Sequence, residues 1–466
     1  MATQRKGGRL AVLLPAAAEG AASGAVLGYG PLYMRQVLGE PSLTVTTLML
    51  ALASLAWFLA AGAWGRVGDR LRRPLAPVGW ALLMSAAAQG VLPFAPNSAA
   101  FIAIVVFWAC VLAAVAPLSV SWLTLQAPDR PAQEAAGFYR MRSVGWTVGS
   151  LGTSLLVGVL DVAGIAAAFR MGAVLSVVVA AAALAGLRRG ETVPEPWERR
   201  AAAGTAAAGV AAAGDDAAGV IAGDGSATGA TAGDGLVTGA TAVDVAASDE
   251  GNLGEAAPMV PGHGASASAP IWRLQAVATL LGVILLTVTG NEAFFAVLGP
   301  YLTEHLGGSL EYVGISMGVA SFLGIVVMGP LGRLADSWGA ERVLVAGCLG
   351  YVAVYGLVAL LQDPLATLIL FGMPMFPFMS AGATGTIARR TPPERRAEAV
   401  GLYEGTSSLA GSFGSLLGGT VADMVGLARV PLMSVMLAAC GAALAWLRLR
   451  SGYAAGRRQP AAENTP

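Results

Sequence analysis

Charged residues are scarce in this chain of 466 residues. Asp, Glu, Lys and Arg together make up 12% of it, whereas apolar residues make up 56%, and the mean hydropathy is +0.67. A soluble domain is about a quarter charged, so a chain of this length could not cover its own surface in water. The composition therefore favours lipid as the main solvent. The formal net charge is zero, which provides no basic field for nucleic acid.

Histidine and cysteine are also scarce. The two histidines, His263 and His305, lie far apart and outside the apolar runs. Cys110, Cys348 and Cys440 each lie inside an apolar run, without a CxxC spacing or a neighbouring histidine. We therefore expect no metal, no cofactor and no enzyme chemistry based on these residues. The GxxxxGK[ST] motif of nucleotide-driven proteins is absent from the sequence as well.

Twelve apolar runs are long enough to cross a bilayer, whose core of about 30 Å needs about 20 helical residues. Since backbone polar groups in lipid must be satisfied internally, each run is predicted to be a helix. The sequence thus predicts an all-α membrane protein with 12 transmembrane helices. The runs occupy residues 10–34, 43–64, 76–95, 99–123, 136–160, 164–187, 271–302, 310–333, 341–361, 365–388, 397–421 and 427–449.

Arginine alternates between the connections. If the N-terminus is cytoplasmic, the outer connections hold only Arg35, Arg170 and Arg429. Basic residues near span ends stay on the cytoplasmic side. We therefore expect a multi-pass protein of the plasma (inner) membrane with both termini in the cytoplasm. The inner connections hold Arg66, Arg70, Arg72, Arg73, Arg130, Arg188, Arg189, Arg199, Arg200, Arg333, Arg342, Arg389, Arg390, Arg395 and Arg396.

Residues 190–270 differ from the rest of the chain. They are mostly Ala, Gly, Thr, Asp and Ser, and GDGSATGATA at 223–232 is nearly repeated as GDGLVTGATA at 233–242. Such a tract cannot bury enough apolar surface to offset the entropy of the chain, so we predict a disordered cytoplasmic linker. The predicted domains are an N-terminal six-helix bundle (1–189), the linker (190–270), a C-terminal six-helix bundle (271–450) and a cytoplasmic tail (451–466).

The two sets of six runs share short motifs in the same order. The pairs are GPLY at 30–33 with GPYL at 299–302, GRVGDR at 65–70 with GRLADS at 332–337, and GFYR at 137–140 with GLYE at 401–404. Three collinear matches indicate duplicated bundles. Because each half has six spans, the repeats are expected to run parallel, related by an axis along the membrane normal.

The loop GRVGDRLRRP at 65–74 resembles the G-x-L-A-D-R-x-G-R-R loop of the major facilitator superfamily. The resemblance implies two pseudo-symmetric six-helix bundles that transport by alternating access, with this loop latching the cytoplasmic side in one state. A purely topological role for its basic residues is the alternative. The first copy keeps Gly65, Asp69, Arg70 and Arg73 but has Arg72 for the second glycine, and the second copy keeps Gly332 and Asp336 but has Ser337 and Ala340 for arginines.

Glycines in these loops and in two later spans are expected to let helices approach closely. In the loops they are Gly65 and Gly332. In spans 5 and 11 they recur at helical spacing: Gly145, Gly149 and Gly152, then Gly411, Gly414 and Gly418.

Two carboxylates fall inside predicted spans. Glu19 lies near the middle of span 1, and Glu292 lies in span 7 beside Asn291. Ionisable groups at bilayer depth are costly and are functional candidates by default. Carboxylates held away from water bind protons more readily, and the resemblance implies that spans 1 and 7 line the cavity. We predict that Glu19 and Glu292 belong to the proton-coupling or substrate-charge site, the alternative being a structural role between helices.

Further polar and aromatic residues are candidates for the transport pathway. Arg140, Arg142 and Glu404 could form ion pairs between the bundles, since Arg140 and Glu404 occupy equivalent repeat positions; snorkelling towards the cytoplasm is the alternative. Candidates for the cavity lining, with apolar packing as the alternative for the aromatic ones, are Gln89, Trp122, Trp146, Asn291 and Phe294.

The sequence as a whole predicts a secondary active transporter that is not an enzyme. We expect a monomer in the lipid bilayer that moves a small organic solute by alternating access, coupled to protons. One alternative is export of drugs or amphipaths by proton antiport, although span 5 lacks the G-P-x-x-G-G tail found in such exporters. The other is a receptor or scaffold with the same fold that does not transport.

If the loop of 65–74 is a latch, Asp69→Asn should reduce transport more than it reduces the amount of protein in the membrane. The carboxylate is the part of this loop that can accept bonds from a neighbouring helix end or an arginine. Uptake and immunoblots of membrane fractions measure the two quantities, and an equal loss of both would reject the latch.

Overall fold

The computed structural model describes residues 2–68, 75–126, 131–187, 275–391 and 396–456, and within these ranges the chain is helical without strands. The predicted linker, together with Asp69, Arg70 and Arg73, lies outside the described residues. The helices before that gap are α1 (Ala2–Gln36), α2 (Leu43–Gly68), α3 (Leu75–Val91), α4 (Ser98–Leu112), α5 (Val115–Gln126), α6 (Pro131–Leu160) and α7 (Ala163–Leu187). Those after it are α9 (Gln275–Pro300), α10 (Glu311–Leu334), α11 (Ala340–Leu361), α12 (Pro364–Phe371), α13 (Met375–Arg390), α14 (Arg396–Val425) and α15 (Val430–Gly456).

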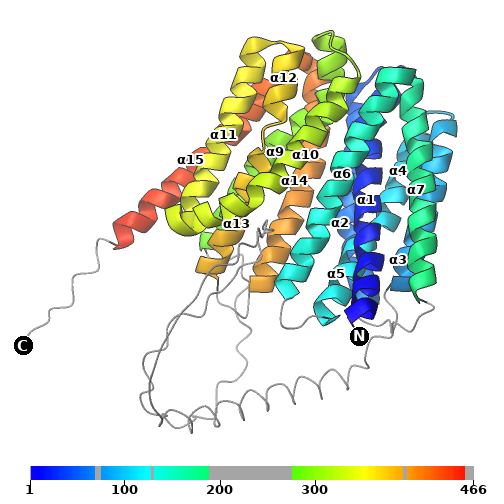
Figure 1. The fold of residues 1–466 in the computed structure, drawn as a ribbon. Helices are drawn as coiled ribbons and strands as arrows, with labels where there is room; N and C mark the ends of the chain where they lie inside the picture. The colour runs from blue at the N-terminus through cyan, green and yellow to red at the C-terminus, as the bar shows by residue number, and fades with distance from the viewer. Residues whose placement is uncertain (1, 69–74, 127–130, 188–274, 392–395, 457–466) are drawn as a thin grey trace, which may run out of the picture.

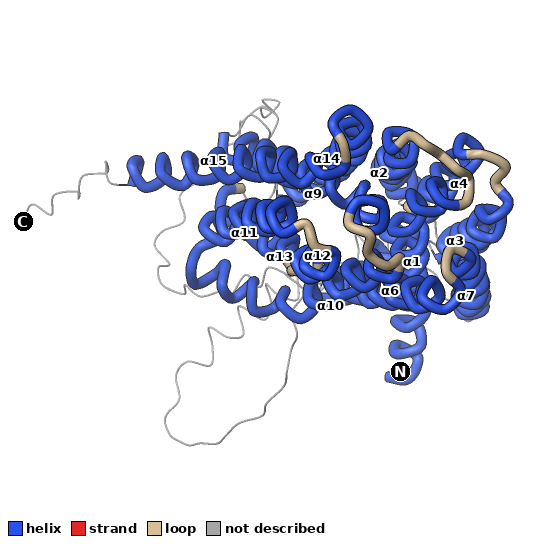
Figure 2. The backbone as a smooth tube through the Cα atoms, turned by 90° about the horizontal axis from the view of Figure 1, so that it is seen from above, coloured by secondary structure: helices blue, strands red, loops and turns tan. Residues whose placement is uncertain are grey.

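The helices form two groups that lie side by side, α1–α7 and α9–α15 (Figure 1). Seen from above, α10 lies next to α6 and α14 lies next to α2, so these two helix pairs join the halves (Figure 2). We call the side at which α1 ends and α2 begins the far face, and the opposite side, at which α2 ends, the near face. The predicted all-α membrane fold is confirmed in this arrangement.

Ten segments of the described residues are long and apolar enough to cross a membrane. One of them, Glu311–Leu361, contains both α10 and α11, which are separated at Gly339 by a positive φ of 104°. Glycine adopts this conformation without steric cost, and the chain turns there into α11. Helix α14 is not among the ten. The number of twelve spans therefore stays a prediction.

The span predicted at 99–123 is divided into two helices in the structure. Helix α4 ends at Leu112 and α5 begins at Val115. Pro117 has no N–H to donate to the carbonyl of Ala113, and its ring would clash with that carbonyl in a continuous helix. The break therefore follows from one residue of the sequence.

Helices α1 and α6 of the N-terminal half cross with their backbones in direct contact. A Cβ atom on Gly145 of α6 would collide with the carbonyl oxygen of Ala17 in α1, and one on Gly149 would collide with that of Ala21. From the other side, Gly24 of α1 faces the carbonyl of Trp146, which a Cβ would approach to 2.8 Å. Only glycine fits at such a crossing, so these glycines fix how closely α1 and α6 pack.

The equivalent helices of the second half cross in the same way. A Cβ on Gly414 of α14 would lie 2.8 Å from the Cβ of Glu292 in α9, and one on Gly418 would collide with the carbonyl oxygen of Ala293. The predicted close packing through the glycine rows is thus confirmed for both crossings. Their repetition in the two halves is the clearest sign of the pseudo-symmetry.

The expectation of close approach is wrong for Gly152 of α6. Among the described residues, no atom lies within 4 Å of a Cβ built on Gly152, and the same holds for Gly65 in the last turn of α2. Gly152 lies on the exposed side of α6, whereas its neighbours Thr153 and Ser154 are buried. Helical spacing put Gly152 close to Gly149, but the two glycines point in different directions around the helix.

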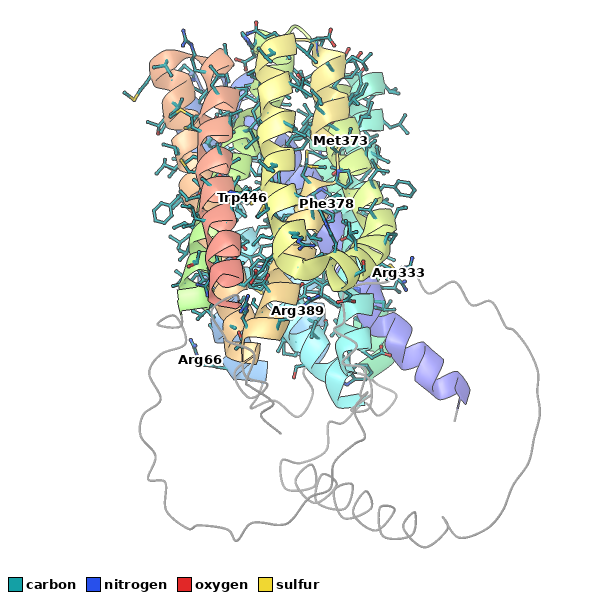
Figure 3. All side chains as sticks on the ribbon, turned by 90° about the vertical axis from the view of Figure 1, so that its left-hand side faces the viewer. Arg66, Arg333, Met373, Phe378, Arg389 and Trp446 are labelled. Atoms are coloured by element: carbon teal, nitrogen blue, oxygen red, sulfur yellow. The ribbon has the colours of Figure 1, made fainter. Side chains whose placement is uncertain are left out.

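The outer surface of the bundle is apolar over most of its height. Large side chains on it include Leu155, Val159, Leu360 and Met424, each at least 70% exposed. Exposed apolar surface on this scale is unstable in water and suits a bilayer. Figure 3 shows the large side chain of Trp446 on this outer surface.

Gly149→Val should destabilise the fold by about 1–3 kcal/mol, because the added side chain has to displace the backbone of α1. Gly152→Val is the matched control, since it adds the same atoms one turn away, where space is open. Thermal unfolding of both variants in detergent measures the difference. Equal melting temperatures would contradict the backbone contact.

Candidate functional site

Glu19 lies at the crossing of α1 and α6 and is completely buried. Its Oε1 is 3.1 Å from Nε of Arg142 on α6, whose side chain is 30% exposed. Gly20, the next residue, lets α6 approach, because a Cβ there would collide with the carbonyl oxygen of Arg142. The backbone contact that sets the helix distance therefore also brings these two charges together.

An aromatic ring completes the surroundings of Arg142. The guanidinium carbon lies 5.3 Å from the ring centroid of Trp57 on α2, a distance at which a cation is attracted to the ring face. Trp57 is itself held by an edge-on contact with Trp108 of α4, at 6.2 Å between centroids. The sequence did not identify Trp57 as a site residue, because a tryptophan inside an apolar run is expected to pack in the core.

Glu292 lies at the equivalent crossing, that of α9 and α14. Its Oε1 accepts a hydrogen bond of 3.0 Å from Nδ2 of Asn291, and Oδ1 of Asn291 accepts one of 2.7 Å from the hydroxyl of Tyr355 on α11. The three side chains form a hydrogen-bonded chain from α11 to α9. Tyr355 was not predicted either, and its only signal in the sequence is a tyrosine inside a span.

Two predicted lining residues are packed away from any open space. Phe294 is fully buried in an aromatic cluster, with its ring 5.1 Å from that of Tyr301 and 5.3 Å from that of Tyr355. Gln89 is buried between α3 and α7, where its Nε2 donates to the hydroxyls of Ser85 and Ser176. Phe294 is thus packed as its alternative described, and Gln89 is enclosed between two helices of its own half.

The two predicted tryptophans differ in exposure. Trp146 on α6 is half-buried, and its backbone packs against Gly20 and Gly24 of α1. Trp122 on α5 is 6% exposed, and its Nε1 has no hydrogen-bond partner among the described residues. Only Trp146 and Asn291, both partly exposed, keep the accessibility that a lining residue needs.

Arg142 belongs to the predicted set of charges between the halves. Arg140 and Glu404 are both exposed. Arg142 is paired directly with Glu19 in its own half. This pair within one half was not expected from the sequence, in which Arg140, Arg142 and Glu404 were candidates for ion pairs between the bundles.

The second copy of the loop motif makes its contacts inside its own half. Asp336 Oδ1 is 3.7 Å from Nη2 of Arg389 at the end of α13, and the same nitrogen donates to the carbonyl oxygen of Ala335 at 2.7 Å. Nearby, Arg390 pairs with Glu341 at 2.9 Å. These exposed pairs join α13 to the turn between α10 and α11, and Gly332 lies partly buried just before that turn.

A family model decides which family these features belong to. The model of the Major Facilitator Superfamily matches residues 12–415, with a second match over 280–465. This chain belongs to the major facilitator superfamily. As a member of that family with a transporter fold, it is a multi-pass membrane transporter.

Known relatives agree with this assignment. An uncharacterized MFS-type transporter of Methanocaldococcus jannaschii is 26% identical over 160 residues, which cover 34% of this chain and 39% of that relative's length. A crystal structure of a mutant of the nucleoside transporter NupG is 12% identical, with a TM-score of 0.67 over 95% of this chain and 99% of that chain. A bacterial homolog of the human lysosomal transporter Spinster, in an inward-facing and unoccupied conformation, is 13% identical with a TM-score of 0.64 over 96% and 97%. At these identities the two structures show the fold alone.

Arg142→Gln should lower the melting temperature, because it leaves the buried Glu19 without its counter-charge. Removing one partner of a buried ion pair typically costs about 3–5 kcal/mol. The double variant Glu19→Gln/Arg142→Gln should recover most of that loss, and the exposed Arg333→Gln serves as control. A single variant that melts like the parent protein would show that the pair adds nothing to stability.

Proposed function

We propose that this member of the major facilitator superfamily moves a small organic solute across the plasma membrane by alternating access, coupled to protons. The observation that carries the proposal is the equivalent placement of its two intramembrane carboxylates. Glu19 lies at the crossing of α1 and α6, and Glu292 lies at that of α9 and α14. Carboxylates at this depth are costly, and such groups commonly serve ion or substrate pathways.

Proton binding at Glu19 would change the charge balance between the halves. When Glu19 is ionised, its charge is neutralised by Arg142 at 3.1 Å. A proton on Glu19 removes that partner and leaves the guanidinium of Arg142 against the ring of Trp57. Glu404 of α14 is the acidic residue of the other half that we expect this released charge to attract.

Glu292 would act as the second site through its hydrogen-bonded chain. Asn291 donates to Glu292 and accepts from Tyr355, so a change at the carboxylate is passed to α11. Asn291 and Glu292 are both partly exposed, which leaves them open to water or solute. We assign these two residues to the solute-binding or proton-binding region.

The near face is proposed to be cytoplasmic. Arg66, Arg333 and Arg389 lie towards this end of the bundle (Figure 3), in agreement with the rule that basic residues stay inside. Among the described residues, hydrogen bonds that join the halves between mid-depth and the far face include that of Ser321 to the carbonyl of Ser143 and that of Ser154 to the carbonyl of Glu311. These contacts support a state in which the far face is closed, and the Spinster homolog was solved in an inward-facing conformation.

The solute is proposed to be small, organic and polar, since Asn291 and Glu292 are the partly exposed polar groups of the site. The fold of the nucleoside transporter NupG supports including nucleosides among the first compounds tested. Export of cationic amphipaths by proton antiport is distinguished by the direction of accumulation in the same assay.

In proteoliposomes with an imposed pH gradient, the parent protein should accumulate at least one solute of a panel of nucleosides, hexoses and cationic amphipaths. Glu19→Gln and Glu292→Gln should each abolish accumulation driven by the pH gradient and leave solute exchange intact. The reason is that the amide of glutamine, unlike a carboxylate, does not bind and release a proton. Glu341→Gln is the matched control, since it removes a carboxylate that pairs with Arg390 on the near face, away from both helix crossings.

Radiolabelled solute measures accumulation, and an internal pH-sensitive dye measures proton movement. Retention of the full pH dependence in Glu19→Gln would remove this residue from the coupling. Accumulation that follows a sodium gradient but not a proton gradient would contradict proton coupling as a whole.

A further inference from the structure

The N-terminus of α2 is capped by a carboxylate from the other half. Asp423, near the end of α14, accepts hydrogen bonds of 2.8 Å from the backbone N–H groups of Leu43 and Thr44 and from the hydroxyl of Ser42. The first N–H groups of a helix have no partner within the helix, and a negative charge at this end is favoured by the helix dipole. Ser42 supplies a local cap by accepting from the N–H of Val45 at 3.2 Å, and Asp423 satisfies the remaining donors.

The close approach that allows this contact comes from a glycine. A Cβ on Gly419, one turn before Asp423, would collide with the hydroxyl of Thr47 and approach the carbonyl oxygen of Leu43. Helix α14 can therefore lie directly against the first turns of α2. The carboxylate reaches the helix end only while these two helices are in contact.

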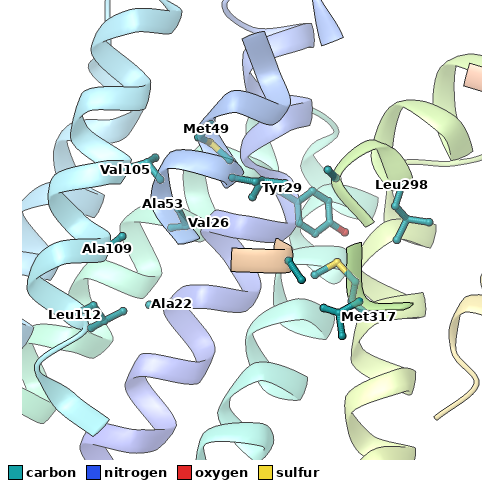
Figure 4. Packing of buried hydrophobic residues seen from close by; sticks show 14 of the residues in the cluster. Ala22, Val26, Tyr29, Met49, Ala53, Val105, Ala109, Leu112, Leu298 and Met317 are labelled. Carbon is teal, nitrogen blue, oxygen red and sulfur yellow. The ribbon is translucent and has the colours of Figure 1, made fainter. Parts of the chain in front are cut away.

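The start of α10 shows the same arrangement with the halves exchanged. The N-cap residue of α10, Leu310, makes no capping hydrogen bond with its side chain. The hydroxyl of Tyr29 on α1 accepts from the N–H of Gly314 at 2.9 Å and donates to the carbonyl of Leu310 at 3.4 Å. In Figure 4 the ring of Tyr29 points from α1 towards the helix that carries Met317.

Helices α2 and α10 are the second membrane helices of their halves, so the exchange is reciprocal. Each begins at the far face. In α2 the first two N–H groups, those of Leu43 and Thr44, donate to Asp423 of the other half, and in α10 the N–H of Gly314 in the first turn donates to Tyr29 of the other half. An ion pair lies at the same face, where Arg35 at the end of α1 donates from Nε to Oε1 of Glu304 at 2.9 Å and contacts its other oxygen through Nη2. Every one of these contacts joins the two halves.

We propose that these reciprocal caps form the latch of the far face and that Asp423 is its main determinant. The inference rests on the alternating access proposed above, in which the far face must open during each cycle. Opening separates α14 from α2 and α1 from α10, so the caps exist only in the closed state. Their loss therefore shifts the equilibrium between the two states rather than the stability of either half.

The size of the shift follows from the usual value of a helix cap. Asp423→Asn keeps the shape of the side chain but removes its charge and one of its two acceptor oxygens. The ratio of far-open to far-closed molecules should then rise roughly 2- to 30-fold, the range expected for loss of a negative charge at a helix N-terminus. Tyr29→Phe, which removes only the capping hydroxyl of the other site, should shift the ratio in the same direction by a smaller factor.

Spin labels on the far face can measure this ratio without a known solute. The full chain, with its three native cysteines replaced by alanine, is labelled at Leu160→Cys at the end of α6 and Leu361→Cys at the end of α11. Both positions are exposed, and they belong to different halves. Distances from pulsed electron–electron resonance in lipid nanodiscs then separate a short, closed population from a long, open one.

The chain offers a matched control on the same face. Asp363 also caps a helix N-terminus, accepting from the N–H of Ala366 in α12 at 2.7 Å, but it lies in the same half as that helix. Asp363→Asn should lower thermal stability and leave the distance distribution unchanged. Asp423→Asn and Tyr29→Phe should both increase the long-distance population.

A distribution that stays unchanged in Asp423→Asn, or that shifts equally in Asp363→Asn, would overturn the proposed latch. If Asp423→Asn does not fold, the conservative Tyr29→Phe decides the question alone, and no shift in it overturns the latch. The readout is independent of transport. A shift of distances in a protein that fails to accumulate any solute would therefore reject the proposed function and leave the latch standing.

Discussion

The contact of backbone with backbone at two helix crossings is the constraint on which the rest of this structure depends. Where α1 meets α6, and again where α9 meets α14, glycine on one helix lies against a carbonyl oxygen of the other. The hydrophobic effect does not drive helices together inside a bilayer, so helix association depends on close van der Waals packing of this kind. A side chain larger than hydrogen at Gly149 or Gly418 would push the helices apart. The distances at the site would then be lost.

Both intramembrane carboxylates lie at these crossings, and this explains how a costly group is tolerated there. Glu19 is brought within reach of Arg142 by the same approach that buries it, and Glu292 lies against Gly414 with Asn291 beside it. At the first crossing the partner helix supplies the counter-charge, whereas the polar partner of Glu292 is its own neighbour in α9. The two halves use different partners, an ion pair in one and a hydrogen-bonded chain in the other, so the pseudo-symmetry of the backbone does not extend to the chemistry.

The sequence predicted most of the fold, since length and apolar content are local properties. The run predicted at 136–160 corresponds to α6, whereas the run predicted at 99–123 is divided into α4 and α5 just before Pro117. Glu19 and Glu292 could be found because charge inside a span is rare. Trp57 and Tyr355 could not, because an aromatic residue in an apolar run looks the same whether it packs or binds. Contacts between residues 380 positions apart, as between Leu43 and Asp423, leave no pattern in a local window.

Exchange of caps between the halves also has a consequence for how the protein is made. During synthesis α2 enters the membrane long before α14 exists, and its first N–H groups must be satisfied by water until residue 423 arrives. The first half therefore has N–H groups at its far face that only the second half can bind. If the two halves were produced as separate fragments, each would expose N–H groups at the start of its second membrane helix. Association of the fragments would be favoured by the hydrogen bonds that join the halves in the intact chain. The hydrogen bonds at the starts of α2 and α10 therefore favour assembly of the two halves.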